Sequence, residues 1–238
     1  SRPDTKQAAI SPTRRKQVRQ MGAPMNHEQV TRICREATAC RSCFDDKWVE
    51  PAATDIAQPR WVGPEYSSAA LRVVCVLLNP AEGAGKGDSA ASLGRMLISD
   101  FASGSAPLTS LFEHQGRTMP TWKDGRFLDF YTTGLGLRFN EMAFANVAWC
   151  ASKGNKYPDP MLLRCFQAHT LPLLVELQPD VVLLSGSKTH PFMFAIGGAI
   201  PDSTCVDMLH CAHRKGRVAT QQEHARIRTI LEGIRSAR

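Results

Sequence analysis

The sequence lacks long hydrophobic runs, an apolar leader and a balance of charge. No stretch of about 18 consecutive apolar residues occurs, so no membrane-spanning helix is expected. The first residues are polar and basic, without an apolar signal core, which indicates a cytoplasmic protein. Asp and Glu number 22 against 29 Lys and Arg, and the resulting net charge of +7 favours a polyanionic partner such as nucleic acid.

The two familiar phosphate-binding loops are also missing. Residues 71–78 form a short apolar run that predicts a buried strand, and a glycine-rich segment, residues 79–88, leads from it into a predicted helix. A P-loop requires Gly where this segment has Pro80, and Ser or Thr where it has Gly87. The dinucleotide-binding pattern fails at Asp88. The segment therefore predicts a ligand-binding loop of neither familiar type at the end of a strand.

The chain contains eight cysteines, which in a reducing compartment indicate metal ligands or buried thiols rather than disulfides. Cys40 and Cys43 form a C-x2-C pair, which places two thiolates in one turn. A predicted strand, residues 142–149, leads into Cys150, and a loop rich in Gly, Asn and Pro then leads to Cys165 at the start of a helix. Cys150 and Cys165 flank a loop and are placed to hold a metal, whereas the C-x2-C pair can be a metal site, a redox pair or incidental.

Strand and helix patterns alternate along the chain, which predicts an α/β fold. We expect a three-layer α/β/α sandwich around a short, mainly parallel four-stranded sheet. The expected strands cover residues 71–78, 142–149, 181–184 and 204–209, and the expected helices cover residues 27–37, 90–101, 161–178, 188–196 and 220–235. Asn79, Asn146 and His210 then fall at strand ends. Ligands bind at the carboxyl edge of such sheets, so these three residues predict a binding site.

The expected domain organisation is simple. Residues 1–25 are predicted to form a flexible basic arm, either solvated or attracted to phosphates, and residues 26–238 to form one domain. An insert at about residues 102–141 is expected to be irregular and is rich in aromatic and basic residues. Such a mixture either lines a nucleic-acid groove by stacking and phosphate contact or simply packs its aromatic side chains.

From about Arg35 to Arg217, apart from the insert, the chain resembles the uracil-DNA glycosylase superfamily, most closely its iron–sulfur branches. The resemblance rests on three stretches, which are NVAWCASKGNKYPDPMLLRC, the later LLVELQPDVVLLSG and the earlier CRSC. It implies a [4Fe–4S] cluster held by Cys40, Cys43, Cys150 and Cys165, and four thiolates in a cytoplasmic chain agree with that. A four-cysteine zinc site and unliganded buried thiols are the alternatives.

The resemblance also implies roles at the first strand end. Asn79 occupies the position that holds the hydrolytic water, in the Asn-Pro form that other branches of the superfamily carry. The iron–sulfur branch has Gly-Glu-Ala-Pro-Gly there, so Leu78 replaces the residue before Ala, and Leu cannot act as a base. An amide is a poor base too, so a dissociative reaction is expected. Leu78 and Asp88, which flank this motif, are assigned to the base-binding group.

Two further strand ends complete the implied site. Asn146 resembles the strand Asn that reads the pyrimidine edge, because an amide offers a donor and an acceptor together. His210 resembles the His that stabilises the leaving base, although Cys211 replaces the usual Pro and His213 is a competing choice. DNA contacts are expected from the following cationic loop, namely from Arg214, Lys215 and Arg217.

The resemblance thus implies a DNA glycosylase of base excision repair. It would flip uracil or a related deaminated base out of DNA and hydrolyse its N-glycosidic bond. No membrane, no obligatory protein partner and a cytoplasmic, nucleoid-associated location are expected. Two alternatives stay open: a glycosylase-fold protein that binds nucleic acid with little catalysis, and a zinc-stapled enzyme of another α/β family.

Overall fold

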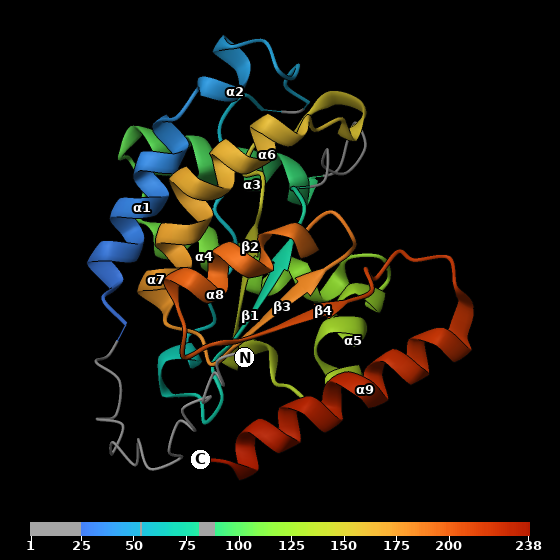
Figure 1. Ribbon diagram of the computed structural model, residues 1–238. Helices are drawn as coiled ribbons and strands as arrows, with labels where there is room; N and C mark the ends of the chain where they lie inside the picture. The colour runs from blue at the N-terminus through green and yellow to red at the C-terminus, as the bar shows by residue number, and fades with distance from the viewer. Residues whose placement is uncertain (1–24, 53, 81–88) are drawn as a thin grey trace, which may run out of the picture.

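The centre of the molecule is a parallel four-stranded sheet (Figure 1). The computed structural model describes residues 25–52, 54–80 and 89–238, and the predicted arm at residues 1–25 lies almost entirely outside them. The strands are β1 (Val73–Leu77), β2 (Met142–Asn146), β3 (Val181–Ser185) and β4 (Thr204–Met208). Their order across the sheet is β2-β1-β3-β4, and all neighbouring pairs are parallel. The predicted parallel α/β architecture is therefore confirmed.

The burial of the strands explains why their sequences are so apolar. All five residues of β1, β2 and β3 are buried, whereas β4, at the edge, exposes part of its length. Alternate residues of β1 enter two different cores: Val74 and Val76 pack on one face, and Val73, Cys75 and Leu77 on the other. A strand covered on both faces needs apolar residues at every position.

Helices cover both faces of the sheet and complete the three layers (Figure 1). The first face is covered by α1 (His27–Ala39), α3 (Ser89–Ser103), α4 (Leu108–Thr118), α6 (Asp159–Cys165), α7 (Leu171–Leu177) and α8 (Met193–Ala199). The opposite face is covered by α5 (Arg126–Tyr131) and the long α9 (Gly216–Ser236). The short α2 (Ser42–Asp45) lies above this body and carries the second cysteine of the C-x2-C pair.

Single helical turns connect these elements. The 3₁₀ turns are Tyr66–Ser68, Met119–Thr121, Thr133–Leu135, Phe139–Glu141, Lys153–Asn155 and His190–Phe192. The predicted helix over residues 161–178 is divided, because a π-helical turn, Phe166–Thr170, separates α6 from α7. Pro172 lies in the first turn of α7, where its missing N–H breaks the hydrogen-bond ladder.

The prediction that residues 102–141 are irregular was wrong, because most of this segment is helical. Its aromatic residues at positions 127, 130 and 131 have helical spacing, and in α5 they form one buried face against the sheet. Glycine and polar residues between the apolar ones make this helical period hard to recognise in the sequence. Packing therefore accounts for most of the aromatic content, but Trp122 stays partly exposed.

An extended segment covers the outer edge of β2. Val62 forms an antiparallel bridge with Ala143, and Phe144 N–H donates to the Trp61 carbonyl at 2.8 Å. Gly63 approaches so closely that a Cβ there would lie 2.1 Å from the Asn140 carbonyl oxygen, so only glycine fits. The segment blocks further strand pairing at this edge and runs toward the carboxyl end of β2.

Across the residues that the structure describes, no helix has the length and apolar character needed to span a membrane.

Candidate functional site

The predicted strand-end residues share one edge of the sheet. Asn146 ends β2 and pairs in register with Leu77, the last residue of β1. The pairing continues past both strands, since Ala148 N–H donates to the Leu78 carbonyl at 2.8 Å, so the chain leaves β1 for Asn79 beside the segment that follows Asn146. His210 follows β4, with β3 lying between it and the two asparagines. The three candidate residues thus lie in a row along the carboxyl edge of the sheet.

Asn146 is buried, with 1% of its surface exposed, yet neither its side-chain oxygen nor its nitrogen has a partner among the described residues. Its main chain, by contrast, is held firmly. The Thr170 hydroxyl donates to the Asn146 carbonyl at 2.6 Å and accepts the Trp149 indole N–H at 2.9 Å. A buried polar group without a partner costs about 1–3 kcal/mol, so the fold holds this amide in place without satisfying it.

Asn79 is positioned by the loop that follows β2. Its Nδ2 donates to the Asn155 side-chain oxygen at 3.0 Å and to the Pro80 carbonyl at 2.7 Å. Asn155 has a left-handed backbone with φ of 52°, which this residue type tolerates, and this conformation presents its side chain to Asn79. Among the described residues the Asn79 Oδ1 has no hydrogen-bond partner, so this atom remains an acceptor for a ligand or water.

Tyr157 connects these parts and was not anticipated from the sequence. Its hydroxyl accepts the Ser152 N–H at 3.0 Å, donates to the Cys150 carbonyl at 3.2 Å and contacts the Asn79 amide. Burial raises the pKa of Tyr157, although the hydrogen bonds from Ser152 and Asn79 oppose the rise. The residue therefore couples the strand end of β1 to the cysteine-bearing loop. The only signal in the sequence is one Tyr inside a polar, proline-containing loop.

His210 and His213 differ in how their rings are used. The His210 Nδ1 accepts the Ala212 N–H at 3.1 Å, so a neutral ring carries its proton on Nε2, which has no partner in the described part of the chain. The His213 Nδ1 accepts the Lys215 N–H at 3.1 Å, and its Nε2 lies 2.9 Å from the Thr220 hydroxyl. Both nitrogens of His213 are thus used, one by its own loop and one by α9, and His210 is the ring with a donor to offer.

The charge state of His210 follows from its surroundings. Burial lowers the pKa of His210 below its ordinary value, and the nearby cations Lys123 and His213 lower it further. The imidazole is therefore neutral at pH 7. Gly186, with φ of 93°, follows β3 and passes so close that a Cβ there would lie 3.4 Å from the His210 Cβ. The turn after β3 thus sets the position of the histidine backbone.

A buried chain of hydrogen bonds ties the His210 loop to the sheet. The Tyr131 hydroxyl of α5 lies 2.6 Å from the Ser185 hydroxyl at the end of β3 and accepts the Cys211 N–H at 3.2 Å. Ser185 in turn donates to the Leu209 carbonyl at 3.3 Å. Tyr131 and Ser185 are both buried, so each bond lost here leaves an unsatisfied group.

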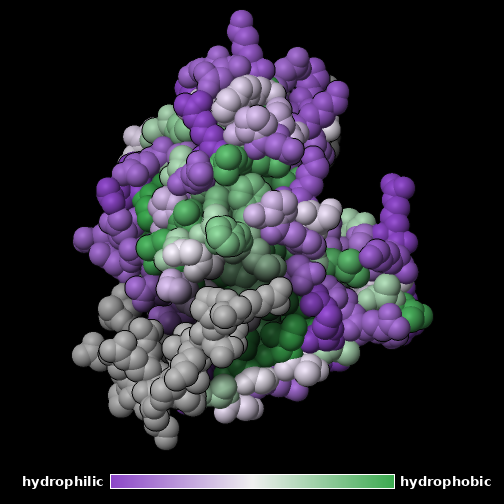
Figure 2. Space-filling view, viewed as in Figure 1, coloured by the Kyte–Doolittle hydropathy of each residue, from purple (hydrophilic) through white to green (hydrophobic). Residues whose placement is uncertain are grey.

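The predicted DNA-contacting cations lie just beyond His210. Arg214, Lys215 and Arg217 are exposed in the loop and at the start of α9, and none forms an ion pair with another described residue. This end of α9 projects at the right of the molecule with a largely hydrophilic surface (Figure 2). Of the residues assigned to base binding, Leu78 is partly buried against the core, and Asp88 lies outside the described residues.

The four predicted metal ligands converge from distant parts of the chain. Cys40 caps the end of α1, Cys43 lies in α2, Cys150 follows β2, and Cys165 ends α6. The Cys43 sulfur is in hydrogen-bond contact with Cys150 and Cys165, and Cys40 is near enough to influence both electrostatically. Sequence spacing alone predicted two pairs, and the fold brings the pairs together.

The surroundings of these thiols favour thiolate at two of them. Hydrogen bonds from Cys150 and Cys165 lower the pKa of Cys43 well below its usual range. A hydrogen bond from His169 lowers the pKa of Cys40 to about 7, against the opposing effect of burial. The Trp149 main-chain N–H also donates to the Cys165 sulfur at 3.2 Å. Thiolates are the form that binds metals.

His169 is the residue of this group that sequence reasoning missed. It is buried against Cys40 and the Trp149 ring, whose centroid lies 5.9 Å from its own. Its position four residues after Cys165 in one continuous helical segment was the available signal, because such residues share a helix face.

The four residues fit an iron–sulfur cluster, because all four are cysteines and the fold brings them close together. Across the described residues, no group of three or more His, Cys, Asp or Glu side chains is already arranged to hold a metal ion. The Cys43 sulfur instead accepts hydrogen bonds from the Cys150 and Cys165 thiols. Cluster binding would replace those contacts with sulfur–iron bonds and release the thiol protons.

No protein-family model matches this chain, and no curated protein sequence matches it.

Proposed function

We propose that this protein is a DNA glycosylase that excises uracil or a related deaminated base. The observation that carries the proposal is the buried Asn146 amide, whose donor and acceptor lack partners at the carboxyl edge of the sheet. A buried unsatisfied amide is costly unless a ligand completes it. A pyrimidine edge with an acceptor oxygen beside an N–H is complementary to that amide, and uracil presents such a pair.

The other strand-end residues supply the remaining chemistry in this proposal. The bond between C1′ and the base nitrogen breaks first, and its electron pair leaves with the base. The His210 Nε2–H stabilises the resulting anion by donating to a carbonyl oxygen of the base. Asn79 holds a water through its Oδ1, and that water adds to C1′ and then loses a proton. Because an amide is a weak base, bond breaking precedes water attack, and a modest rate is expected.

The cysteines and cations complete the proposal. Cys40, Cys43, Cys150 and Cys165 would hold a [4Fe–4S] cluster that braces the loop carrying Asn155 and Tyr157, with zinc as the alternative. Arg214, Lys215 and Arg217 would contact DNA phosphates in a cytoplasmic, nucleoid-associated protein. Anaerobically purified protein is expected to be brown, with iron and acid-labile sulfide. A colourless protein that contains zinc and no iron would refute the cluster.

A cleavage assay tests the enzymatic proposal. The protein is incubated with single- and double-stranded DNA carrying uracil, hypoxanthine or xanthine, and alkali then cuts the strand at any abasic site. Scission is expected for the wild type and should be lost in Asn79→Ala with DNA binding retained. Asn140→Ala, which changes an exposed Asn outside the edge, is the matched control. No scission at a high excess of protein would refute the proposal.

One observation favours a second candidate function, a glycosylase-fold protein that binds nucleic acid with little catalysis. The Asn79 Nδ2 is already bonded to the Pro80 carbonyl and to Asn155 of the loop after β2, and the two residues before Asn79, Leu77 and Leu78, are apolar and cannot act as a base. The same assay separates the two candidates. DNA binding that is sensitive to Asn146→Ala, without scission of any substrate, would favour the second.

A further inference from the structure

Arg60 lies beside the candidate site, but it is not one of the strand-end residues, cysteines or exposed cations described above. It lies in the extended segment along β2, between Trp61, whose carbonyl accepts the Phe144 N–H, and Gln58, whose N–H donates to the Trp149 carbonyl at 2.8 Å. These two bonds bracket Arg60 beside the end of β2, where Asn146 lies. The backbone is rigid here, since Gln115 also donates to the Pro59 carbonyl at 2.8 Å.

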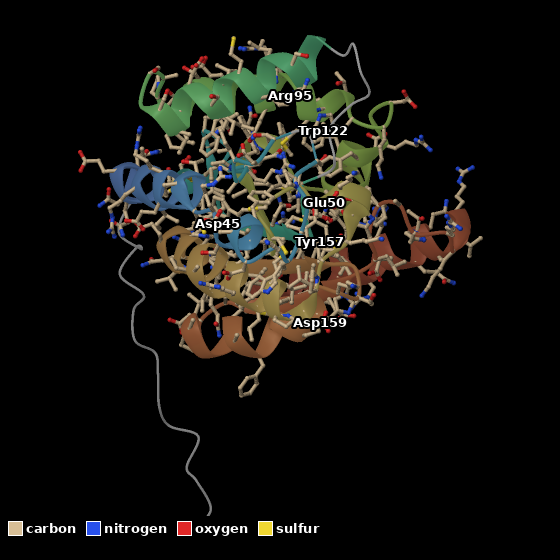
Figure 3. The ribbon with its side chains drawn as sticks, turned by 90° about the horizontal axis from the view of Figure 1, so that it is seen from above. Asp45, Glu50, Arg95, Trp122, Tyr157 and Asp159 are labelled. Carbon is tan, nitrogen blue, oxygen red and sulfur yellow. The ribbon has the colours of Figure 1, made fainter. Side chains whose placement is uncertain are left out.

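The Arg60 side chain reaches two aromatic residues of the site. Its guanidinium carbon lies 5.5 Å from the centroid of the Trp122 ring, and Tyr157 is the group with which it interacts electrostatically. Tyr157 in turn contacts Asn79. Seen from above, Trp122 and Tyr157 both lie over the central part of the molecule, Trp122 toward α3 and Tyr157 toward α6 (Figure 3). Arg60 therefore connects the insert to the Asn79 loop.

Among the described residues, the Arg60 guanidinium has no anionic partner. Other partly buried arginines of the described chain are bonded: Arg72 pairs with Asp180, and Arg95 donates to the Ser92 hydroxyl. Arg60 forms neither an ion pair nor a hydrogen bond with any described residue. Burial lowers its pKa to about 10, so the guanidinium is desolvated but still charged at neutral pH. A desolvated charge without a counter-ion is unfavourable, and proteins otherwise avoid it.

We propose that Arg60 binds a phosphate of the nucleic-acid strand, beside the nucleotide whose base enters the site. Trp122 occupies one face of the guanidinium, which leaves its N–H edge free for the bidentate geometry that phosphate prefers. A phosphodiester also supplies a negative charge, which no described residue places against Arg60. The inference rests on the proposed function for its choice of nucleic acid, but phosphate binding does not require that any base be excised.

Binding of a uracil-free, single-stranded oligonucleotide tests the inference. Fluorescence anisotropy at several salt concentrations compares the wild type, Arg60→Met, Arg60→Lys and a control, Arg126→Met. Arg126 is an exposed arginine already paired with Asp124. Arg60→Met is expected to weaken binding about tenfold, and its salt slope should fall by about 0.7, the value for one phosphate contact on a single strand. Arg60→Lys should recover only part of the affinity, because lysine cannot bind bidentately.

Thermal unfolding separates a binding role from a structural one. If Arg60 serves a ligand, Arg60→Met removes a partly buried charge that no described residue pairs, and the melting temperature of the free protein should stay the same or rise. If Arg60 is structural, the same variant should melt earlier and bind DNA as the wild type does when folded, which would overturn the inference. Trp122→Leu should weaken oligonucleotide binding in the same direction as Arg60→Met, and to a smaller extent.

The two proposals fail in different ways. Wild-type protein that binds uracil-free DNA through Arg60 but cuts no substrate would refute the glycosylase and leave the phosphate site standing. Protein that excises uracil while Arg60→Met binds and reacts normally would refute the phosphate site alone. Wild-type protein that does not bind the oligonucleotide at low salt would overturn the phosphate site directly.

Discussion

Asp180 at the amino end of the sheet and Asn146 at its carboxyl end are both buried, with 3% and 1% of their surfaces exposed. Asp180 accepts the Arg72 main-chain N–H at 2.7 Å and pairs with the side chains of Arg72 and Arg238. Asn146 has no partner for either side-chain atom among the described residues. The same sheet thus satisfies a buried polar group fully at one end and leaves one unsatisfied at the other.

The difference separates what the fold needs from what a ligand needs. Asp180 joins the starts of three strands, because its main chain also bonds to Arg72 and Thr204. Removing a satisfied buried charge destabilises a protein, whereas removing an unsatisfied polar group relieves a cost. Substitutions at the amino end of the sheet should therefore mainly lower stability, and substitutions at the carboxyl end should mainly lower activity.

The largest expected effect is on stability at the amino end. Asp180→Ala should lower the free energy of unfolding by about 3 kcal/mol, the low end for breaking a buried pair, because Arg72 and Arg238 keep some contact with water. Excision per folded molecule should not change. Chemical denaturation measures the first quantity, and an exposed acid nearby, Asp202→Ala, is the control. An Asp180→Ala variant as stable as the wild type would contradict the expectation that this buried carboxylate stabilises the amino end of the sheet.

Asn146→Ala should show the opposite pattern. Excision is expected to fall at least about 100-fold, the cost of losing a donor that acts on the reacting group. The free energy of unfolding should stay constant or rise, because an unsatisfied buried amide disappears. Single-turnover cleavage and denaturation, measured on the same preparation, check both parts. A clear loss of stability would show that the amide has a structural partner and would end the contrast with Asp180.

The fold was largely predictable because local sequence and tertiary environment agree here. Continuous apolar runs match β1, β2 and β3. Asn26, a residue type that favours the N-cap position, caps α1 by accepting the Glu28 and Gln29 N–H groups at 3.1 and 3.2 Å. The start of α9 was placed four residues late, since its first turn carries Gly216 and charged residues rather than an apolar stripe. The helical insert was missed for the same reason.

The candidate site was predictable only where a residue's role depends on its position along the chain. Strand-end residues such as Asn146 are found from the strand pattern alone. Arg60 and Tyr157 are different, because each matters through partners that are distant in sequence. An unpaired cation and an unsatisfied amide are properties of what surrounds a side chain, and no spacing rule reports what is missing around it.

The pH dependence of excision should reflect His210. Its pKa is lowered by burial and by the Lys123 and His213 cations, so the neutral, donating ring persists below pH 6.5. Excision should fall about tenfold per pH unit once the pH drops under this lowered pKa, because a proton on Nδ1 removes the acceptor of the Ala212 N–H and releases the ring from its position. His210→Gln should remove that inflection. Lys123→Gln should move the inflection upward, because one of the opposing charges is lost. An inflection above pH 6.5 would contradict the assignment.

The same shift makes a smaller contribution to stability, and its sign is fixed. The folded His210 has a lower pKa than the unfolded one, so between the two values the unfolded chain binds more protons. Stability therefore declines as the pH falls through 6.5 and stops declining below the folded pKa. Denaturation of the wild type and His210→Gln at pH 7.5 and 5.5 checks the direction: only the wild type should lose this increment.

Two buried tyrosines allow the carboxyl end of the sheet to be compared with another part of the protein at the level of single side-chain hydrogen bonds. The Tyr131 hydroxyl bonds at the carboxyl end, to Ser185 and Cys211, whereas the Tyr66 hydroxyl donates to the Leu177 carbonyl, away from that edge, at 3.2 Å. Tyr131→Phe and Tyr66→Phe should each lower the free energy of unfolding by about 1 kcal/mol, the usual net value of one hydrogen bond. Only Tyr131→Phe should also slow excision, by about threefold to tenfold, because it loosens the His210 loop. Equal excision by the two variants would show that the loop is held by other contacts, and that the carboxyl end tolerates more freedom than its hydrogen bonds imply.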